Sequence, residues 1–538
     1  MDTGTLAHRP ADTSVDLMEV TIGDALREAA ADAPDTVALV EATPDAGDGR
    51  QLTYVQLLER SEQVARALSA RFSPGEHVAV WAGNSLEWVL LQYGAALAGV
   101  VLVTVNPALQ AGELAFVLRQ SRSSGLFHMS RFRGTPVEAT VTAAREELPD
   151  LRDVVPFDEW DAFTATADAA TELPDVGPHD DAQIQYTSGT TGTPKGVLLH
   201  HLGIVNNARL SMQRLAAGPA DVLVWPMPLF HTAGCVMGVL GALTVRATLV
   251  CMSQFDPALQ LRLIESERGT ITGGVPTMLQ ALLAHPDSAR RDLSSLRTVV
   301  SGAAPVPVPL AERCEDRFGV PFAVVFGTTE CSCVVTGTRL DDPPQIRTGT
   351  LGTALPHIEV MVADMATGRP VEVGAVGELC ARGHLLMHGY FDDPLATAAA
   401  IDTDGWYHTG DLASMDEAGC LRVEGRIKDM IIRGGENISP KEVEDVLHGH
   451  DQVMAAAVVA KPDDTWGETP AAFVQSVPHA ALTGAELHAY CRQRLAAYKT
   501  PTSWTFVDAL PMTASGKVRK TELRETFVRA TASSAGRS

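Results

Sequence analysis

A loop of small residues that ends in a lysine constrains this chain more than any other stretch. The loop is YTSGTTGTPKG, Tyr186 to Gly196, and it follows an alternating segment over residues 182–186 that predicts a strand. Glycines let a backbone approach an oxyanion closely, while hydroxyls and successive amides donate hydrogen bonds and Lys195 adds a positive charge. The stretch therefore predicts a phosphate-binding loop at the end of a strand.

The spacing of this loop excludes the common P-loop of kinases and GTPases. That loop needs Gly-x-x-x-x-Gly-Lys-Ser/Thr, whereas here the glycines are three residues apart and the lysine lies three beyond the second. A flexible Gly/Thr turn on the surface is the alternative interpretation.

Length and charge limit the fold and the partners. A chain of 538 residues is too long for one ordinary core, so we expect two or more domains. The formal net charge of −24 repels phosphate backbones and anionic membranes, so we expect no nucleic-acid partner. A nucleotide site in such a chain must be made positive locally.

We expect a cytoplasmic location. The N-terminus up to Asp16 is polar, without the apolar run of a secretory signal, and the stretch 89–105 is broken by Gln92 and Gly99, too short for a transmembrane segment. The eight cysteines form no Cys-x-x-Cys pair and no zinc spacing, and Cys331 and Cys333 are interpreted as small apolar residues.

Alternating helical and extended patterns predict an α/β fold with buried, largely parallel strands. We expect residues 1–16 and 529–538 to be frayed tails, and residues 161–180 to form a surface loop. The pattern predicts helices over 22–31, 53–70, 85–97, 308–318, 441–447 and 485–495, and strands over 36–40, 77–81, 100–105, 298–301, 322–326, 453–459, 472–477 and 505–507.

Further along the chain, several short motifs carry polar groups. A strand runs into the small turn Ser301 to Pro305, and another ends in FGTTE, where Glu330 is well suited to hold Mg²⁺. His231 closes the apolar run VLVWPMPLFH, while the pair at 200 and 201 is predicted to be solvated. Read alone, Asp411 in GWYHTGD is a turn residue and Lys517 in a Gly/Ser turn is a surface charge.

Taken in order, these motifs resemble the adenylate-forming superfamily of acyl-CoA synthetases, firefly luciferase and peptide-synthetase adenylation domains. The resemblance covers nearly the whole chain. It implies a large multi-layer α/β N-terminal domain with a small mobile α+β C-terminal domain. The implied boundaries are an adenylation core over 1–424, a hinge over 425–428 and a mobile domain over 429–538 that carries the catalytic lysine.

The resemblance also implies roles for single residues. Lys517 is the catalytic lysine, His231 is a candidate for positioning the substrate, and Thr329 lies beside the reacting phosphate and carboxylate. Glu330 holds Mg²⁺, and Lys428 is the hinge pivot. ATP or AMP is bound by Thr187, Ser188, Gly189, Thr190, Thr191, Gly192, Lys195, Gly302, Ala303, Ala304, Phe326, Gly327, Thr328, Asp411 and Arg426. The loop that lines the thiol tunnel is Arg433, Gly434, Gly435, Glu436 and Asn437, and the acid pocket includes His231, Cys331 and Cys333.

Two departures from the family pattern affect the substrate. Phe326 stands where the family usually has tyrosine, which loses only a phenol, so adenine binding should survive. Cys331-Ser332-Cys333 stands where acyl-CoA synthetases commonly carry Thr-Ser-Pro, which leaves the class of acid open.

The implied function is ATP-dependent, AMP-forming activation of a carboxylic acid, then transfer to the thiol of coenzyme A, with ATP, Mg²⁺ and coenzyme A required. The stretch from Gly377 to Tyr390 looks most like medium-chain and related fatty acyl-CoA synthetases. The alternatives are an enzyme of secondary metabolism that uses another acceptor, forming an amide or activating nitrite for diazotisation, and a catalytically dead nucleotide-binding protein. The oligomeric state stays open, with a homodimer among the options.

Overall fold

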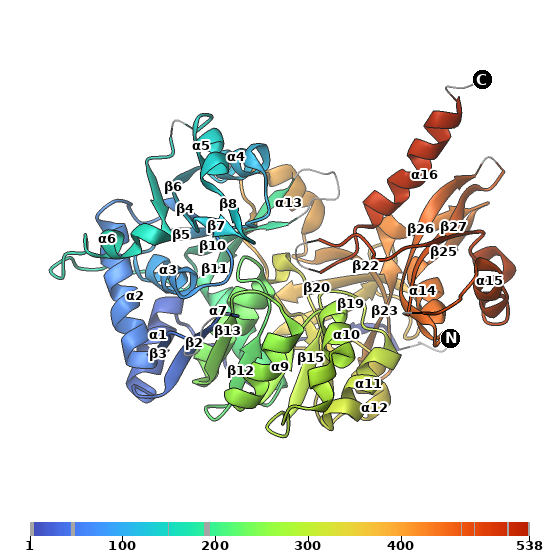
Figure 1. The fold of residues 1–538 in the computed structure, drawn as a ribbon, viewed down its shortest axis with the longest axis horizontal. Coiled ribbons are helices and arrows are strands. Elements are labelled where there is room, and N and C mark those ends of the chain that lie inside the picture. The colour runs from blue at the N-terminus through green and yellow to red at the C-terminus, as the bar shows by residue number, and fades with distance from the viewer. Residues whose placement is uncertain are drawn as a thin grey trace.

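In the computed structural model, a large domain is followed by a smaller C-terminal domain that carries the last strands and helices (Figure 1). The structure describes residues 5–44, 49–148, 150–187, 194–463, 465–477, 479–513 and 516–535, with side chains described as far as residue 527. The fold class predicted from the sequence is confirmed.

The strand that leads to the phosphate loop lies in a seven-stranded sheet of order β21-β11-β10-β5-β4-β6-β9. Its strands β10, β5, β4, β6 and β9 run parallel, and β11 turns back antiparallel to β10. The bounds are β4 His77–Trp81, β5 Val101–Val105, β6 Ser123–His128, β9 Asp153–Pro156, β10 Asp181–Thr187, β11 Lys195–His200 and β21 Gly389–Tyr390.

A nine-stranded sheet of order β18-β17-β16-β15-β14-β12-β13-β2-β3 forms the second layer of strands. Its central strands, from β16 to β2, are parallel and almost entirely apolar, as expected of strands buried on both faces. The bounds are β2 Val37–Ala42, β3 Gln51–Thr53, β12 Val222–Trp225, β13 Thr248–Met252, β14 Ile271–Gly273, β15 Thr298–Ser301, β16 Phe322–Phe326, β17 Thr336–Gly337 and β18 Thr353–Ala354.

A five-stranded antiparallel sheet of order β1-β19-β20-β22-β23 completes the large domain and leads to the hinge. The bounds are β1 His8–Arg9, β19 Ile358–Ala363, β20 Gly377–Gly383, β22 Tyr407–Met415 and β23 Leu421–Arg426. A separate short hairpin joins β7 Arg131–Phe132 to β8 Thr135–Pro136.

Helices pack between the two large sheets and on their outer faces. α2 contacts β2 and β3 of one sheet, while α3 contacts β5 of the other, so the helices between them share one core. The large-domain helices are α1 Ile22–Asp32, α2 Tyr54–Ser69, α3 Leu86–Leu97, α4 Ala111–Gln120, α5 Glu138–Arg145, α6 Trp160–Thr164, α7 His201–Arg214, α8 Gly241–Val245, α9 Pro257–Ser266, α10 Pro276–Ala284, α11 Val308–Phe318, α12 Pro344–Gly349 and α13 Pro394–Ala400. Short 3₁₀ segments are η1 Phe157–Glu159, η3 Pro286–Ala289 and η4 Thr329–Cys331, and η2 Ala233–Leu240 is a π-helix.

Local sequence sets many of the helix ends. α1 and α2 begin with capping boxes, in which the threonines at 21 and 53 exchange hydrogen bonds with Asp24 and Gln56. α11 begins after Pro307 and ends at Gly319, whose φ of +68° is the left-handed conformation that glycine adopts freely.

The C-terminal domain is a five-stranded sheet, in which β25, β24, β27 and β26 pair in order and β28 pairs with β27. The 3₁₀ segment η5 Ile427–Asp429 connects it to the large domain. Its elements are β24 Ile431–Arg433, β25 Glu436–Ile438, α14 Pro440–His448, β26 Val453–Asp463, β27 Gly467–Ser476, α15 Gly484–Arg492, η6 Ala497–Lys499, β28 Ser503–Phe506 and α16 Lys520–Ala535.

One prediction about the chain's periphery was wrong, and two others were wrong in part. The N-terminal segment is no frayed tail, because β1 pairs with β19 and Ala7 is fully buried. The expected C-terminal tail is helical as far as residue 535, in α16, and the expected loop over 161–180 begins inside helix α6. For β1 and α6 the contacts come from residues distant in sequence, which local composition does not reveal. Among the described helices, none has both the length and the apolar character needed to cross a membrane.

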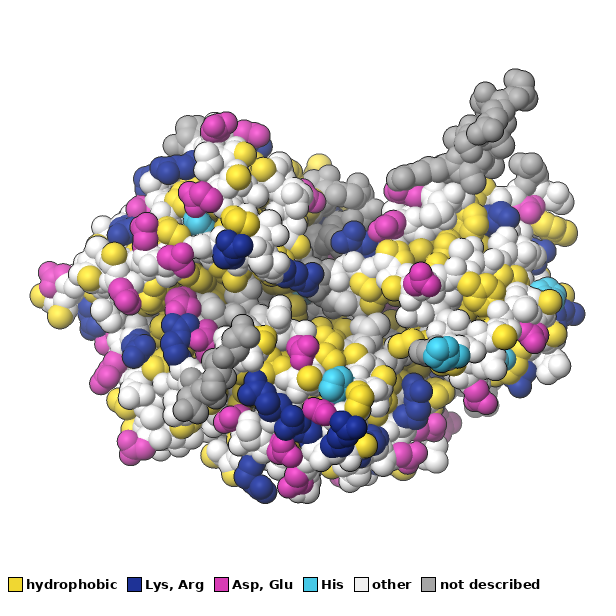
Figure 2. All heavy atoms as spheres, in the orientation of Figure 1, with side chains coloured by type: hydrophobic (Ala, Val, Ile, Leu, Met, Phe, Trp, Pro, Cys, Tyr) yellow, Lys and Arg dark blue, Asp and Glu magenta, His cyan; other side chains and the backbone are white. Residues whose placement is uncertain are grey.

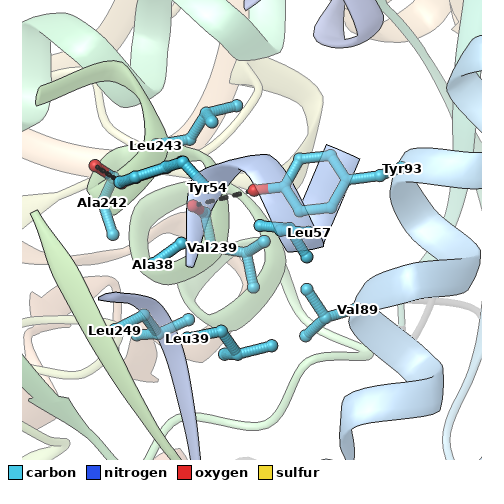
Figure 3. Close-up of a pocket in the computed structure, with 10 residues that line it drawn as sticks. All are labelled: Ala38, Leu39, Tyr54, Leu57, Val89, Tyr93, Val239, Ala242, Leu243 and Leu249. Carbon is cyan, nitrogen blue, oxygen red and sulfur yellow. Dashed lines mark hydrogen bonds between the residues drawn. The ribbon is translucent and has the colours of Figure 1, made fainter. Parts of the chain in front are cut away.

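The helical layer encloses a cavity of about 10 Å³, at the lower limit for one water molecule (Figure 3). Two buried tyrosines border it: the Tyr54 hydroxyl donates to the Ala247 carbonyl at 2.7 Å, and the Tyr93 hydroxyl lies 3.4 Å from the Val239 carbonyl. The cavity is too small for a substrate, so the tyrosines serve to satisfy buried carbonyls.

We expect Y54F to lower the free energy of unfolding by about 1–2 kcal/mol, because it leaves a buried carbonyl without its donor. For a domain of this size, calorimetry should record a fall in Tm of about 1–2 °C. Y93F is the matched control, since its longer hydrogen bond contributes less. An unchanged Tm for Y54F would contradict this account.

Candidate active site

The phosphate loop connects two antiparallel strands as a hairpin. Thr187 ends β10 and lies opposite Lys195, which begins β11. The loop residues Ser188, Gly189, Thr190, Thr191 and Gly192 lie outside the described residues. The described ends of the hairpin place a hydroxyl and an ammonium group at the carboxyl end of a parallel strand.

A tyrosine that sequence analysis missed links this hairpin to the predicted metal ligand. Lys195 Nζ lies 4.6 Å from the centroid of the Tyr390 ring, and the Tyr390 hydroxyl donates to Glu330 Oε1 at 2.8 Å. Burial, then the charge of Glu330, raises the pKa of Tyr390, so its hydroxyl stays protonated and able to donate. Tyr390 is in the two-residue strand β21, and only its place beside β11 reveals its role.

Two tight turns follow the neighbouring parallel strands β15 and β16. In the first turn, Ala303 has a φ of +63°, a strained conformation for alanine that often marks a functional site. A Cβ on Gly302 would lie 2.4 Å from the Val325 carbonyl oxygen, and one on Gly327 would lie 1.7 Å from that of Cys333. The backbone is therefore closely packed at both turns, and Ala304, Phe326 and Thr328 lie beside the turns, each partly buried.

The predicted ribose carboxylate is buried and half-satisfied. Asp411 in β22 lies opposite Arg426 in β23, and Arg426 Nε donates to Asp411 Oδ1 at 2.7 Å. Asp411 Oδ2 is buried without a hydrogen-bond partner. Burial raises the pKa of Asp411 despite the opposing charge of Arg426. Because an unpartnered buried carboxylate oxygen is costly, this atom fits a donor such as a ribose hydroxyl.

Lys517 from the C-terminal domain enters the same site. Burial, then the positive charge of Arg426, lowers the pKa of Lys517, while the charges of Asp411 and Glu330 oppose that shift. Burial and the charge of Lys517 lower the pKa of His231 to about 4, so that imidazole is neutral at pH 7. Residues that are far apart in sequence therefore share one electrostatic environment.

Direct packing seats the lysine turn on the large domain. Gly516, with a φ of +79°, lies so close to α10 that a Cβ would be 2.6 Å from Val275 Cγ2. Elsewhere in the interface, Gln280 Nε2 of α10 donates to the Met454 carbonyl of β26 at 3.2 Å. The surface is notched between the two domains (Figure 2).

The predicted hinge and acceptor loop lie on the C-terminal side. Lys428 is exposed in η5. Gly434 and Gly435 form the turn between β24 and β25 with φ values of +59° and +91°, and the loop, including Glu436 and Asn437, is exposed. These glycines need the left-handed region, which the hairpin turn demands.

An exposed indole that the sequence did not single out supports this loop. Trp466 accepts a hydrogen bond from Gly434 N at 2.8 Å through its carbonyl, and its ring lies 5.4 Å from the Arg433 guanidinium carbon. Arg433 also donates to the Tyr498 carbonyl at 2.6 Å. Half of the Trp466 surface is exposed, which is unusual for so large an apolar side chain.

The predicted acid-pocket residues surround the start of the π-helix η2. His231 is partly buried just before η2, and its carbonyl accepts the backbone N–H of Gly234 at 2.8 Å. Cys331 has no exposed surface and packs in the main core, whereas Cys333 is partly buried, and Thr329 lies nearby in η4. π-helices are often found at functional sites, and this one is rich in small, buried residues.

The prediction that the histidines at 200 and 201 are solvated was wrong. Both are buried, and burial lowers the pKa of each to about 4. His200 Nδ1 accepts the Gly203 N–H at the start of α7, and its ring stacks on His388 at 4.6 Å. They act in the structure as neutral helix-capping and packing groups.

Two domain families match the sequence. The AMP-binding enzyme family matches residues 26–391, and the C-terminal domain of AMP-binding enzymes matches residues 442–517.

Curated relatives match over almost the whole chain. The chain is 39% identical to YngI of Bacillus subtilis (strain 168), over 95% of this chain and 97% of that protein. It is 36% identical to the mitochondrial medium-chain acyl-CoA ligase ACSF2 of Rattus norvegicus, over 97% of this chain and 90% of that protein.

Among solved structures, MatB from Rhodopseudomonas palustris is similar in two states. ATP-bound MatB superposes with a TM-score of 0.86 at 28% identity, and apo MatB with a TM-score of 0.77 at 29% identity. Each comparison covers 95% of this chain and 99% of MatB.

Proposed function

The chain belongs to the family of AMP-binding enzymes and is an AMP-forming acyl-CoA ligase, and from this premise we propose how its residues divide the two half-reactions. The observation that carries the proposal is the position of Lys517, a cation from the C-terminal domain held near Asp411, Glu330 and His231.

In the first half-reaction, a carboxylate oxygen of the acid attacks the α-phosphorus of ATP and pyrophosphate leaves. Little covalent chemistry is needed from the protein, so catalysis consists of positioning and charge neutralisation. Lys517 neutralises the charge shared by the carboxylate and the α-phosphate, Thr329 lies beside them, and the phosphate hairpin with Lys195 holds the leaving group. Neutral His231 orients the acid without repelling Lys517.

The nucleotide is held at the edge of the two sheets. The unpartnered Oδ2 of Asp411 accepts a ribose hydroxyl, and the positive charge of Arg426 favours the ionised form of the carboxylate. The tight turns at Gly302 and Gly327 let the flat adenine lie close to the backbone beside Phe326, which has the ring but no phenolic hydroxyl.

Glu330 is the proposed Mg²⁺ ligand. A carboxylate is a suitable donor for this hard cation, and Tyr390 occupies one oxygen of Glu330 and fixes its orientation. Bound Mg²⁺ would offset negative charge on the phosphates.

In the second half-reaction, the sulfur of coenzyme A attacks the acyl carbonyl, AMP leaves, and the thiol proton is released. We propose that 1–424 form the adenylation core, 425–428 the hinge and 429–538 a mobile domain that rotates about Lys428 between the steps. The higher TM-score against ATP-bound than apo MatB supports a domain arrangement suited to the first step, with the Gly434 loop still exposed to solvent.

For the acid, we propose a medium-chain or similarly apolar carboxylic acid. The small, apolar residues of the π-helix η2 and the partly buried Cys333 offer no charged partner for a polar substrate tail. The name of the ACSF2 relative supports the same class.

We expect K517A to slow pyrophosphate release by about 10²-fold or more, because it removes the cation that stabilises the transition state. Conversion of a pre-formed acyl-adenylate to the thioester should be much less affected. K520A is the matched control. Lys520 lies three residues after Lys517 in the sequence and forms an ion pair with Glu444 at 2.7 Å. Equal loss in K520A would count against a specific role for Lys517.

The pH dependence of the first half-reaction should also show the loss of the positive charge of Lys517. Its cation is lost as pH rises through its pKa, and that pKa is lowered by burial, so the rate should fall at a lower pH than an ordinary lysine would give. In K517R the guanidinium stays charged, so any residual activity should lack this alkaline decline. Stopped-flow pyrophosphate release from pH 7 to 10 makes the comparison.

We expect W466A to raise the KM for coenzyme A about fivefold while leaving pyrophosphate release without coenzyme A unchanged. The exposed indole beside Arg433 offers a flat surface on which a purine can stack, and such stacking contributes about 1 kcal/mol. F506A, which removes another exposed aromatic of the same domain, is the control and should leave this KM unchanged.

The acceptor is tested by product analysis. Purified protein is incubated with ATP, Mg²⁺ and a panel of aliphatic and aryl acids, with coenzyme A, an amine, or nitrite plus an aryl amine. A thioester detected by mass spectrometry only with coenzyme A supports the proposal. Turnover that yields an amide or a diazo product instead would preserve the adenylation step and overturn the choice of acceptor.

A further inference from the structure

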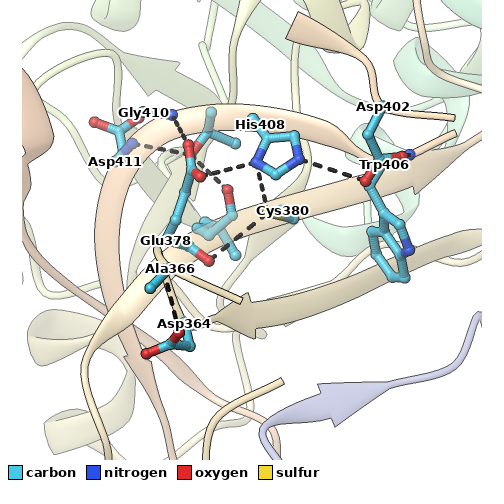
Figure 4. Close-up of polar contacts among 11 residues, drawn as sticks. Asp364, Ala366, Glu378, Cys380, Asp402, Trp406, His408, Gly410 and Asp411 are labelled. Carbon is cyan, nitrogen blue, oxygen red and sulfur yellow. Dashed lines mark hydrogen bonds and ion pairs between the residues drawn. The ribbon is translucent and has the colours of Figure 1, made fainter. Parts of the chain in front are cut away.

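Next to the proposed ribose site, both carboxylate oxygens of Glu378 contact residues of one turn, His408 and Gly410. Glu378 of β20 accepts the Gly410 backbone N–H at 3.0 Å through Oε1, and its Oε2 lies 2.8 Å from His408 Nδ1 (Figure 4). The Glu378 side chain is 14% exposed. Neither Glu378 nor His408 carries a role in the proposed reaction so far.

The turn that Glu378 holds is a bulge in the sheet. Where β20 pairs with β22, Glu378 lies opposite Leu412 and Cys380 opposite His408. The three residues 409–411 of β22 therefore face a single residue, Leu379, of β20. Bulges of this kind redirect a side chain at the cost of ladder hydrogen bonds.

Side-chain hydrogen bonds hold the bulge at the point where the regular pairing of β20 and β22 is interrupted. The Thr409 hydroxyl donates to the Leu379 carbonyl at 2.7 Å and accepts the Asp411 N–H at 3.0 Å. Gly410 has a φ of +71°, which suits glycine, and its N–H depends on Glu378. The residue redirected by this arrangement is Asp411, whose Oδ2 is buried and unpartnered.

His408 is fixed between two carboxylates. Its Nε2 lies 3.5 Å from Asp402 Oδ2 on the side away from Glu378. Burial alone would lower the pKa of His408, but Glu378 and Asp402 outweigh it and raise that pKa. With a proton on Nδ1, the imidazole donates to Glu378 Oε2 and so keeps the carboxylate oriented towards Gly410.

The same side chains could in principle hold a metal ion, since the ligand atoms of Glu378, Cys380 and His408 lie within 4.8 Å of one another. Two observations favour a hydrogen-bonded role. Both oxygens of Glu378 are already engaged, and Cys380 is fully buried with its thiol pKa raised by burial, so a thiolate ligand is disfavoured.

We propose that Glu378, oriented by His408, is a positioning residue that holds the bulge at 409–411 so that Asp411 can bind the ribose hydroxyls of ATP. The inference rests on the proposed nucleotide role of Asp411 but not on the identity of the acid or the acceptor.

The test is binding of ATP and of 3′-deoxy-ATP and 2′-deoxy-ATP, measured by calorimetry on the full-length protein without acid or coenzyme A. A hydrogen bond to a charged group makes a difference of about 10- to 100-fold, so the wild type should bind ATP that much more tightly than at least one deoxy analogue. In E378A the ratio of the Kd for the deoxy analogue to the Kd for ATP should fall close to one, because ATP binding weakens to the level of the deoxy analogue. A variant with merely reduced stability would weaken all three nucleotides and keep the ratio.

Two further variants sharpen the test. E378Q keeps an acceptor for the Gly410 N–H, so it should restore most of the discrimination between ATP and the deoxy analogues. If E378A folds poorly, E378Q can be measured in its place. E359Q is the matched control, because Glu359 of the neighbouring strand β19 also pairs with a histidine, His8 at 2.6 Å, and its other oxygen accepts from Arg382, outside the bulge, at 2.8 Å. It should retain the wild-type ratio.

The outcomes separate this inference from the proposed function. Wild-type discrimination in E378A, or no discrimination in the wild type, overturns the inference. If micromolar zinc abolishes ATP binding and C380A removes that effect, the group is a metal site and the inference is also overturned. A protein that binds ATP with the expected ratios but forms no acyl-CoA would instead refute the proposed function and leave the inference standing.

Discussion

A partly buried cation at the junction of two domains organises this protein. Lys517 lies where its charge is felt by Asp411 and Glu330 of one domain and where burial lowers its pKa. A lysine can be held there only while acidic partners or phosphates compensate it, because an isolated buried charge is costly. In the proposed reaction, a closed C-terminal domain and a bound anionic nucleotide would therefore favour each other.

The same reasoning explains how a chain of net charge −24 can bind ATP. Figure 2 shows acidic and basic side chains interspersed over the surface seen there, so attraction of a nucleotide depends on local groups. Lys195, Arg426 and Lys517 come from three distant parts of the chain: the start of β11, the end of the antiparallel strand β23 and the C-terminal domain. Arg426 lies close enough to Lys517 for its charge to lower the pKa of that lysine.

Irregular backbone carries much of the site. Ala303 is in the left-handed region, Asp411 lies on a bulge, and His231 precedes a π-helix. Each irregularity gives up regular hydrogen bonds or adds strain, and nearby contacts compensate, as Glu378 does for Gly410. The regular strands form a rigid frame, and the irregular backbone segments determine where the side chains of the site point.

The sequence by itself determined the fold class, the order of motifs and several of the regular elements, such as the strand over 77–81 and the helix over 308–318. It could do so because hydrophobic period, capping residues and glycine turns are local signals. Tertiary structure alone decided that Tyr390 contacts Glu330, that Glu378 holds Gly410, that His200 and His201 are buried and that the N-terminal segment joins a sheet as β1. Each of these depends on a partner between roughly 30 and 350 residues away, and burial and pairing at such separations are set by the packing of whole layers, which no local pattern records.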